Sequence, residues 1–448
     1  MKAIMQQQTK NERFRFVARK SPDWIRNGVV YEVFPRSFSK EGNIDAIVDK
    51  LPTLKALGIT ILWLMPIHPI GSIHRKGRLG SPYSVRDYYK IHNKIGNIGK
   101  FIRLVHECHK YRLHIIIDLV IGHTAWDNQL FLRHPDWYKI DKSGNFRPPD
   151  PRWKDVVALD YSKTAVVRYM LKLMNYWVGY VGVDGFRCDD AGRVPLRFWE
   201  MARKTLERKR PILMIAESDR HPYHHRNAFD LSYGTDFYVA LKEVIDGRAP
   251  ASRLHEVIEM ELSKYPKGSL LLRFTSNHDK NIQEGSDTEV FGLRGAKLAA
   301  VVNNAIPGVP MLYNGQETGN QKRIDLFNPT KIQREHDKQF SRLYKHLFTI
   351  RRVHPALIDG RYIRIPTSDD QHIFTFCRVL IDDCILIATN LSKRALSVKM
   401  SLPPEVINWR GVLKCTNLLT GRRAVMKNVN DGSFELKLPS FGYLILSI

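Results

Sequence analysis

Short apolar runs alternate with amphipathic stretches over most of the chain, from Val29 to about His354. Apolar runs of this length, bounded by polar residues, are typical of strands that are buried on both faces. We expect strands at residues 29–34, 59–64, 113–120, 229–231, 270–275 and 310–313, and two more that end at Asp189 and Glu217. Eight such strands, alternating with helical patterns, predict an α/β fold with a closed parallel (β/α)8 barrel.

The stretches between the strands carry apolar residues at helical spacing. Residues 44–57 predict a helix that is closed by Gly58 as a left-handed C-cap, although Pro52 within it conflicts with a straight helix. Ser162 is the expected N-cap of a helix that ends near Val181. Further helices are expected around residues 101–108, 194–209, 296–305 and 331–353.

Two segments depart from this alternation. Residues 122–161 are a long excursion after the third strand, rich in aromatic residues, proline and aspartate, and such loops are usually functional. Beyond Gly360, short strands at 362–365, 373–377, 384–389, 398–402, 412–415, 434–438 and 443–448 predict an antiparallel β-sandwich. We therefore expect the first part of the barrel at 1–121, an insert domain at 122–161, the rest of the barrel at 162–358 and a C-terminal β-sandwich domain at 359–448.

The composition is that of a large globular protein with an unusual charge. The chain has 448 residues and a formal net charge of +25, from 70 Lys and Arg against 45 Asp and Glu. The positive charge is spread along the chain and accompanies no nucleic-acid-binding motif. We therefore expect a basic solvated surface and no nucleic-acid partner, with an anionic polymer as the alternative.

The cysteines and the N-terminus bear on the location of the protein. Cys108, Cys188, Cys377, Cys384 and Cys415 show no metal-binding spacing, and the first two are expected to be buried thiols. Pairing of Cys377 with Cys384 across a hairpin is the alternative to free thiols. The N-terminal segment has no apolar signal run, and no segment reaches the roughly 18–20 apolar residues of a membrane span. A reducing cytoplasm is the expected location.

Carboxylates follow directly after several of the expected strands. The segments GFRCD, ILMIAE and FTSNHD end at Asp189, Glu217 and Asp279, and IIIDLVIGH contains Asp118 and ends at His123. A parallel barrel delivers functional side chains at the C-terminal ends of its strands. Two carboxylates that flank a glycosidic bond are the usual requirement for glycoside hydrolysis. The sequence therefore predicts a site for that chemistry at this end of the barrel.

These four segments, in this order, resemble those of the α-amylase family of glycoside hydrolases (family 13). The resemblance extends from about Val29 to the C-terminus and includes VYEVFPRSF at 30–38, LGITILWLMPI at 57–67, SPYSVRDYY at 81–89 and PMLYNGQE at 310–317. It implies that the insert after strand three forms one wall of a substrate cleft.

The resemblance implies a role for each strand-end acid. Asp189 matches the family's nucleophile, Glu217 its general acid and base, and Asp279 its third acid, which grips sugar hydroxyls and stabilises the transition state. Arg187 lies two residues before Asp189 on a strand, so it faces the same side and should keep that carboxylate ionised. Burial and like charge should keep Glu217 protonated.

Further residues resemble the family's substrate-binding groups. Tyr83 and His123 match the residues that line the pocket for the sugar at the cleaved bond, where a ring stacks on the sugar and an imidazole donates to a hydroxyl. His278 matches the histidine beside the third acid. Asp118 is expected to support Arg187 or the barrel mouth rather than to touch substrate.

One departure from the family concerns calcium. Where this chain has Gly122, the family usually has an asparagine that commonly binds a structural calcium ion. Glycine offers no side-chain ligand, so we expect no metal or other cofactor at that site. A different calcium site built from acids of the insert, such as Asp127 or Asp136, stays open.

The expected function is retaining hydrolysis of α-1,4-glucosidic bonds in maltooligosaccharides or in starch- or glycogen-type glucans. A transglycosylase or a sugar isomerase of the trehalose-synthase type is the first alternative, because it would use the same intermediate. A non-catalytic glucan-binding protein is the second, and the complete set of acids argues against it. Chain-length preference and oligomeric state stay open.

Overall fold

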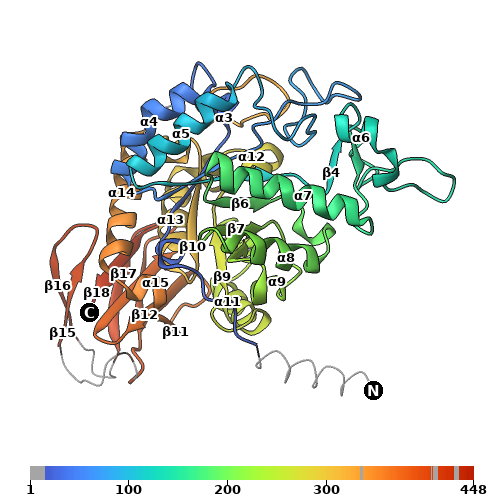
Figure 1. Cartoon of the computed structure of the whole chain (residues 1–448). Coiled ribbons are helices and arrows are strands. Elements are labelled where there is room, and N and C mark those ends of the chain that lie inside the picture. The colour runs from blue at the N-terminus through green and yellow to red at the C-terminus, as the bar shows by residue number, and fades with distance from the viewer. Residues whose placement is uncertain (1–15, 333–336, 405, 407–411, 428–432) are drawn as a thin grey trace.

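The computed structural model of the chain describes residues 16–332, 337–404, 406, 412–427 and 433–448. Its centre is a closed, all-parallel barrel, as the apolar runs predict (Figure 1). Around the barrel the strands follow the order β1 (Val30–Val33), β10 (Val309–Tyr313), β9 (Leu270–Arg273), β8 (Leu231–Tyr233), β7 (Leu213–Ala216), β6 (Gly185–Cys188), β3 (His114–Leu119) and β2 (Ile61–Leu64). The apolar runs form strands because their residues are buried on both faces.

One strand is displaced from its predicted position. We expected residues 229–231, whereas β8 begins at Leu231. Asp230 is held before the strand by other bonds, since its carboxylate accepts hydrogen bonds from Ser21 and from the backbone N–H of Met214. It also forms an ion pair with Arg203. These contacts make the side chain of Asp230 a buried polar anchor, while its backbone N–H donates to the carbonyl oxygen of Met214 at 2.9 Å.

The helices that surround the barrel largely follow the predicted spacing. They are α4 (Ile44–Leu57), α5 (Ile98–Lys110), α7 (Thr164–Tyr176), α8 (Leu196–Glu207), α10 (Thr235–Ile245), α11 (Ser252–Lys264), α12 (His278–Glu284), α13 (Asp287–Ala305) and α14 (Lys338–Val353). Shorter turns are α2 (Asp23–Arg26), α3 (Pro35–Phe38), α9 (His224–Asn227), α15 (Ala356–Asp359), η3 (Ala191–Arg193) and η4 (Gln316–Thr318). Gly58 closes α4 in the left-handed conformation, with φ of 108°, as expected. None of the described helices is long and apolar enough to cross a membrane.

Three helix predictions need correction. Ser162 does not cap α7; Lys163 occupies the N-cap position, without a side-chain hydrogen bond, and the helix continues as a π-turn, η2 (Trp177–Val181). Helix α13 begins well before residue 296, because Ser286 and Glu289 form a capping box at its start. The spacing analysis also assigned no helices where α10 and α11 lie. Residues 333–336 of the expected helix at 331–353 lie outside the described residues.

The segment after β3 projects to one side of the barrel (Figure 1). It contains a two-stranded antiparallel ladder, β4 (His123–Ala125) with β5 (Val156–Ala158), and the short helices α6 (Gln129–Arg133) and η1 (Pro135–Trp137). The ring of Phe131 contacts those of Trp126, Tyr138 and Phe146. This aromatic cluster gives the segment a small core of its own.

The C-terminal part is antiparallel, as predicted. One sheet has the order β11 (Arg361–Arg364), β12 (Ile373–Leu380), β13 (Asp383–Asn390), β18 (Tyr443–Ser447), β15 (Val412–Asn417) and β16 (Arg423–Lys427), and a second pairs β14 (Leu396–Met400) with β17 (Phe434–Leu438). Side chains of both sheets share one apolar core. Strand β16 was not predicted, because its basic residues interrupt the alternation of apolar and polar positions that is typical of a strand. The cysteines are free and buried, so Cys377 and Cys384 form no disulfide.

Two buried arginines lie at the base of the barrel, and one of them, Arg378, joins it to the C-terminal sheet. Arg351 on α14 donates from Nη2 to the carbonyl oxygen of Gly308 at 2.7 Å. Arg378 on β12 donates from Nη1 to Ala305 at 2.9 Å and from Nη2 to Gly360 at 3.0 Å. In the described part of the chain, the hydrogen-bond acceptors of both guanidinium groups are carbonyl oxygens.

Candidate active site

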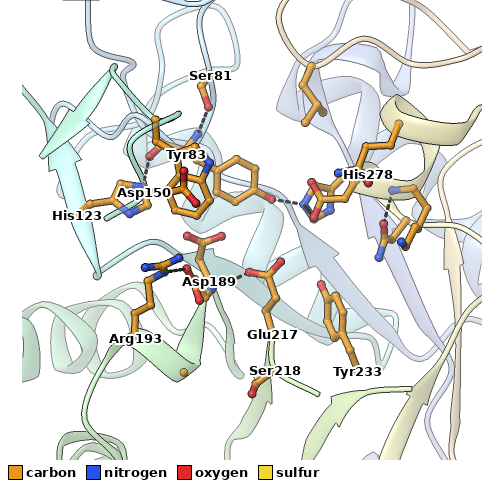
Figure 2. Close-up of a pocket in the computed structure, with 18 of the residues that line it drawn as sticks. Ser81, Tyr83, His123, Asp150, Asp189, Arg193, Glu217, Ser218, Tyr233 and His278 are labelled. Atoms are coloured by element: carbon orange, nitrogen blue, oxygen red, sulfur yellow. Dashed lines mark hydrogen bonds and ion pairs between the residues drawn. The ribbon is translucent and has the colours of Figure 1, made fainter. Parts of the chain in front are cut away.

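A cavity of about 680 Å³ opens at the C-terminal end of the barrel. Its walls include six residues predicted from the sequence, which are Tyr83, His123, Asp189, Glu217, His278 and Asp279 (Figure 2). The other two predicted residues, Asp118 and Arg187, lie immediately beneath, fully buried. The structure therefore brings together eight side chains that are spread over almost 200 residues of sequence.

The close approach of β6 and β7 places the two central acids side by side. Cys188 is the register partner of Ala216, so Asp189 and Glu217 leave neighbouring strands at the same level. Gly185 permits this approach, because a Cβ atom there would lie 1.9 Å from the carbonyl oxygen of Leu213. Its φ of 147° is also one that side chains rarely adopt.

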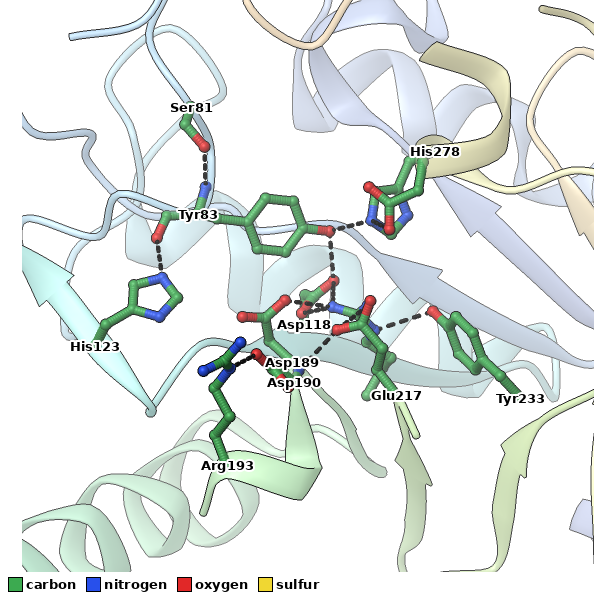
Figure 3. Close-up of polar contacts among 12 residues, drawn as sticks. Ser81, Tyr83, Asp118, His123, Asp189, Asp190, Arg193, Glu217, Tyr233 and His278 are labelled. Carbon is green, nitrogen blue, oxygen red and sulfur yellow. Dashed lines mark hydrogen bonds and ion pairs between the residues drawn. The ribbon is translucent and has the colours of Figure 1, made fainter. Parts of the chain in front are cut away.

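Arg187 is the hub of an acid cluster formed by Asp118, Asp189 and Glu217, which Figure 3 labels. Its Nη1 atom donates to Asp118 Oδ1 at 2.9 Å and to Asp189 Oδ1 at 3.0 Å. Its Nη2 atom forms an ion pair with Glu217 Oε2 at 2.8 Å, and its Nε atom donates to the Tyr233 hydroxyl at 3.1 Å. One cation thus faces three carboxylates, and the planar guanidinium fixes their relative positions.

The two central acids differ in burial in a way that the sequence did not predict. The Asp189 side chain is 11% exposed and that of Glu217 is 28% exposed. Burial and the nearby charge of Glu217 raise the pKa of Asp189 well above its usual value, and Arg187 opposes this rise. The sequence predicted that burial would favour the neutral form of Glu217, whereas its side chain is partly exposed.

Glu217 has a second donor, from the residue after the expected nucleophile. Asp190 adopts a left-handed conformation with φ of 39°, and its backbone N–H donates to Glu217 Oε2 at 2.7 Å. The Asp190 carboxylate accepts a hydrogen bond from Arg193 Nε at 2.5 Å. Arg193 in turn donates to the carbonyl oxygen of Pro149 at 2.7 Å, and its guanidinium lies over the ring of Trp153. This chain of contacts connects Glu217 to the segment after β3.

On the opposite wall, His278 and Asp279 begin helix α12, which Asn277 caps. His278 Nε2 lies 2.7 Å from the Tyr83 hydroxyl and 3.4 Å from Asp279 Oδ2. The Asp279 side chain is 39% exposed and stays apart from the Arg187 cluster. Asp279 lines the same cavity as Asp189 and Glu217.

His123 lies in the cavity wall in a specific tautomer. Its Nε2 atom is 3.1 Å from the carbonyl oxygen of Tyr83, so it must carry the proton and donate. Burial lowers the pKa of His123 to about 4, so the ring is neutral at pH 7 and its Nδ1 atom is an acceptor. This differs from the donor role that the resemblance implied.

Sequence reasoning missed several residues of this site, which are Glu32, Asp190, Trp153, Arg193 and Tyr233. Glu32 could have been identified from the sequence, because it is a carboxylate within the otherwise apolar strand β1. It is fully buried, and its Oε1 atom lies 2.5 Å from His278 Nδ1. The other four follow from loop and barrel geometry, for which a single sequence carries no clear sign.

The surroundings of Gly122 do not fit a metal site. A Cβ atom at Gly122 would meet Val194 Cγ2 at 4.0 Å and no polar group. The Ser72 hydroxyl donates a hydrogen bond to Asp127 Oδ2 at 2.7 Å, and Arg86 forms an ion pair with the same carboxylate. Among the described residues, no three His, Cys, Asp or Glu side chains are grouped so that they could hold a metal ion.

Comparisons with known proteins agree with this architecture. The family model for the alpha-amylase catalytic domain matches residues 31–155 and 149–352. A crystal structure of a noncanonic maltogenic alpha-amylase from Thermotoga neapolitana superposes with a TM-score of 0.87 at 31% identity, over 95% of this chain and 99% of that one. The barrel, the strand-end acids and these matches define a glycoside hydrolase. The chain belongs to the alpha-amylase family.

Curated relatives are more distant and longer. The alpha-amylase MalA of Haloarcula japonica is 25% identical over 84% of this chain and 57% of its own length. An alpha-1,4-glucan:maltose-1-phosphate maltosyltransferase of Cereibacter sphaeroides is 26% identical over 82% of this chain and 59% of its own. The chain thus spans a little more than half the length of these two relatives.

Proposed function

We propose that the protein hydrolyses α-1,4-glucosidic bonds of maltooligosaccharides or related glucans with retention of configuration. The observation that carries this proposal is the pair of carboxylates, Asp189 and Glu217, held by the single guanidinium of Arg187 at the floor of an open cavity. Retaining glycosidases need two carboxyl groups about 5–5.5 Å apart, and the contact of both acids with one guanidinium favours such a separation.

The contacts divide the roles between the oxygen atoms. Arg187 engages Oδ1 of Asp189, which leaves Oδ2 free to attack the anomeric carbon and form a glycosyl–enzyme ester. The Asp190 N–H and Arg187 both engage Oε2 of Glu217, which leaves Oε1 to carry the proton for the leaving oxygen. In the second step the Glu217 carboxylate takes a proton from water, and the water cleaves the ester.

Burial and Glu217 raise the pKa of Asp189, and Arg187 opposes this rise. The double displacement requires an ionised Asp189, which the contact with Arg187 favours. Asp279 and His278 would hold sugar hydroxyls.

The test is a time course on a maltooligosaccharide series followed by NMR and product separation. Shorter maltooligosaccharides that appear first as the α-anomer are the expected result. Initial release of the β-anomer would exclude the double displacement, and an absence of cleavage on every α-1,4-linked substrate would exclude the proposed activity.

Transglycosylation at the same site is the second candidate. It is favoured by the similarity to a protein named as a maltosyltransferase, and by the half-buried ring of Trp153 in the cavity wall, on which an acceptor sugar can stack. The same time course separates the two candidates, because transfer yields products longer than the starting oligosaccharide whereas hydrolysis yields only shorter ones.

We further propose a cytoplasmic location, no nucleic-acid partner and no bound metal cofactor. The support for the first is that Cys108, Cys188, Cys377 and Cys384 are buried thiols that form no disulfide. Fractionation of the source cells, followed by detection of the protein, tests the location.

A further inference from the structure

Glu32 is a charged residue in the interior of the barrel. It lies on β1, in register with Trp63 on β2 and Tyr313 on β10, and its side chain is fully buried. Its Oε1 atom contacts His278 Nδ1 at 2.5 Å, whereas its Oε2 atom has no hydrogen-bond partner in the described part of the protein. Burial raises the pKa of Glu32, and the charge and hydrogen bond of His278 oppose this rise, so the charge of this carboxylate depends on His278.

The hydrogen bonds on either side of His278 form a directed series. Tyr83 donates its hydroxyl proton to Asp118 Oδ2 at 3.2 Å, so the Tyr83 oxygen is left to accept from His278 Nε2 at 2.7 Å. With Nε2 donating to Tyr83 and Nδ1 donating to Glu32, the ring carries both protons. With Glu32 ionised, this geometry gives the imidazolium form of His278.

The charges around the ring agree with this form. Three acids lie near the ring: Glu32 on β1, Asp279 on α12, and Asp118, which is reached through Tyr83. The ring of Trp63 on β2 contacts His278 edge-on. The cation of Arg187 on β6 is the nearby positive charge. Burial alone lowers the pKa of His278, but the charges of Asp279 and Glu32 outweigh burial and Arg187, and raise the pKa to about 9.

We propose that Glu32 is a positioning residue that holds the imidazole of His278 in one orientation and in its doubly protonated form, with Nε2–H directed to the hydroxyl of Tyr83 in the cavity wall. This inference rests on the proposed function for its catalytic meaning. A cationic ring holds the Tyr83 hydroxyl in place more strongly than a neutral ring does, because a hydrogen bond from a charged donor is stronger. Without Glu32, Nδ1 loses its acceptor and the ring is free to turn or to lose a proton.

The decisive variant is Glu32→Gln, which keeps the side-chain shape and an acceptor oxygen but removes the charge. We expect the pKa of His278, followed by NMR of protein labelled with ¹⁵N in histidine, to fall by about one unit or more from its value near 9. The His278 signals are assigned by their loss in His278→Gln. The alkaline limb of the kcat/KM profile should move to lower pH by the same amount, with a smaller change in KM than in kcat.

Asp287→Asn is the matched control, because Asp287 is also a buried acid but bonds to Gln316 and Thr288 rather than to a histidine. It should leave the titration of His278 unchanged. An unchanged His278 titration in Glu32→Gln would overturn the proposal, as would a shifted titration with an unmoved kcat/KM profile. If the titration shifts but the wild type cleaves no glucan, the proposed function fails while the coupling of Glu32 to His278 stands.

Discussion

Buried arginines lie at both ends of the barrel, and their partners differ. At the C-terminal end, Arg187 meets Asp118, Asp189 and Glu217. At the other end, Arg351 and Arg378 meet carbonyl oxygens. All three guanidinium groups are almost wholly buried, so burial alone does not distinguish them.

The difference in partners changes the electrostatics. Burial disfavours the charge of Arg187, but Asp118 and Glu217 together raise its pKa well above the usual value. Burial lowers the pKa of Arg351 to about 10 and that of Arg378 to about 9, because carbonyl dipoles compensate a charge less fully than carboxylates do. The contacts of Arg187 with carboxylates change the ionisation of groups that can take part in a reaction. The contacts of Arg351 and Arg378 with carbonyl oxygens hold backbone segments together.

The largest expected effect is that of Asp189→Asn at the C-terminal end. Loss of the nucleophile removes the covalent step, so turnover on maltooligosaccharides should fall by several orders of magnitude. Because the pKa of Asp189 is raised in the folded state, its ionisation opposes folding as the pH rises above its unfolded value. The variant should therefore melt at or above the wild-type temperature at pH 7. Activity within about tenfold of wild type would contradict the assigned role.

A smaller loss is expected for Arg187→Lys. Lysine keeps one positive charge but lacks the planar fork that contacts three carboxylates at once. We expect kcat/KM to fall by about a hundredfold or more, with a clear change in the pH profile, because the acids lose their fixed spacing. Arg193→Lys is the comparison variant, since Arg193 is partly exposed and contacts the acids only through Asp190. An equal loss in both variants would show that Arg187 is not the hub.

At the base, Arg378→Met should change stability and not chemistry. Removal of the guanidinium leaves the carbonyl groups of Ala305 and Gly360 without their donor, which we expect to lower the free energy of unfolding by about 3 kcal/mol. Activity per folded molecule at a temperature well below the melting point should stay at the wild-type level. Denaturant unfolding and a kinetic assay provide the two measurements, and the exposed Arg422→Met serves as a control for loss of charge.

The smallest effect is expected from removal of calcium. Hard cations need about six to eight oxygen ligands, and Gly122 supplies no side-chain oxygen. We expect a chelator to change neither the melting temperature nor the activity. A fall of about ten degrees on chelation that added calcium restores would show that other oxygen atoms build a calcium site.

The alternation of apolar runs was enough to predict the barrel and to place acids at the ends of its strands. Asp189 and Glu217 converge because parallel strands end at the same rim, and this rule needs no knowledge of contacts. The family resemblance then supplied Tyr83, whose position in a loop carries no periodic signal. The structure places its hydroxyl 3.2 Å from Asp118.

Other features of the site depend on contacts between residues far apart in the sequence, which the pattern of apolar and polar positions does not encode. The contact of Glu32 with His278 joins residues 246 positions apart. The relative burial of Asp189 and Glu217 depends on the turn at Asp190, a left-handed residue that is not glycine. For the same reason the partly exposed side chain of Glu217 was mistaken for a desolvated one.

The long sequence separation between Glu32 and His278 has a consequence for the order of events during synthesis. The contact between Glu32 on β1 and His278 can form only after β9 and α12 have left the ribosome. Contacts of high sequence separation carry a large loop-closure entropy and form late in folding. A nascent chain that ends before residue 278 therefore contains Asp189 and Glu217, the proposed nucleophile and acid, but lacks His278 and Asp279 of the cavity wall. The cavity is thus completed only as the barrel closes.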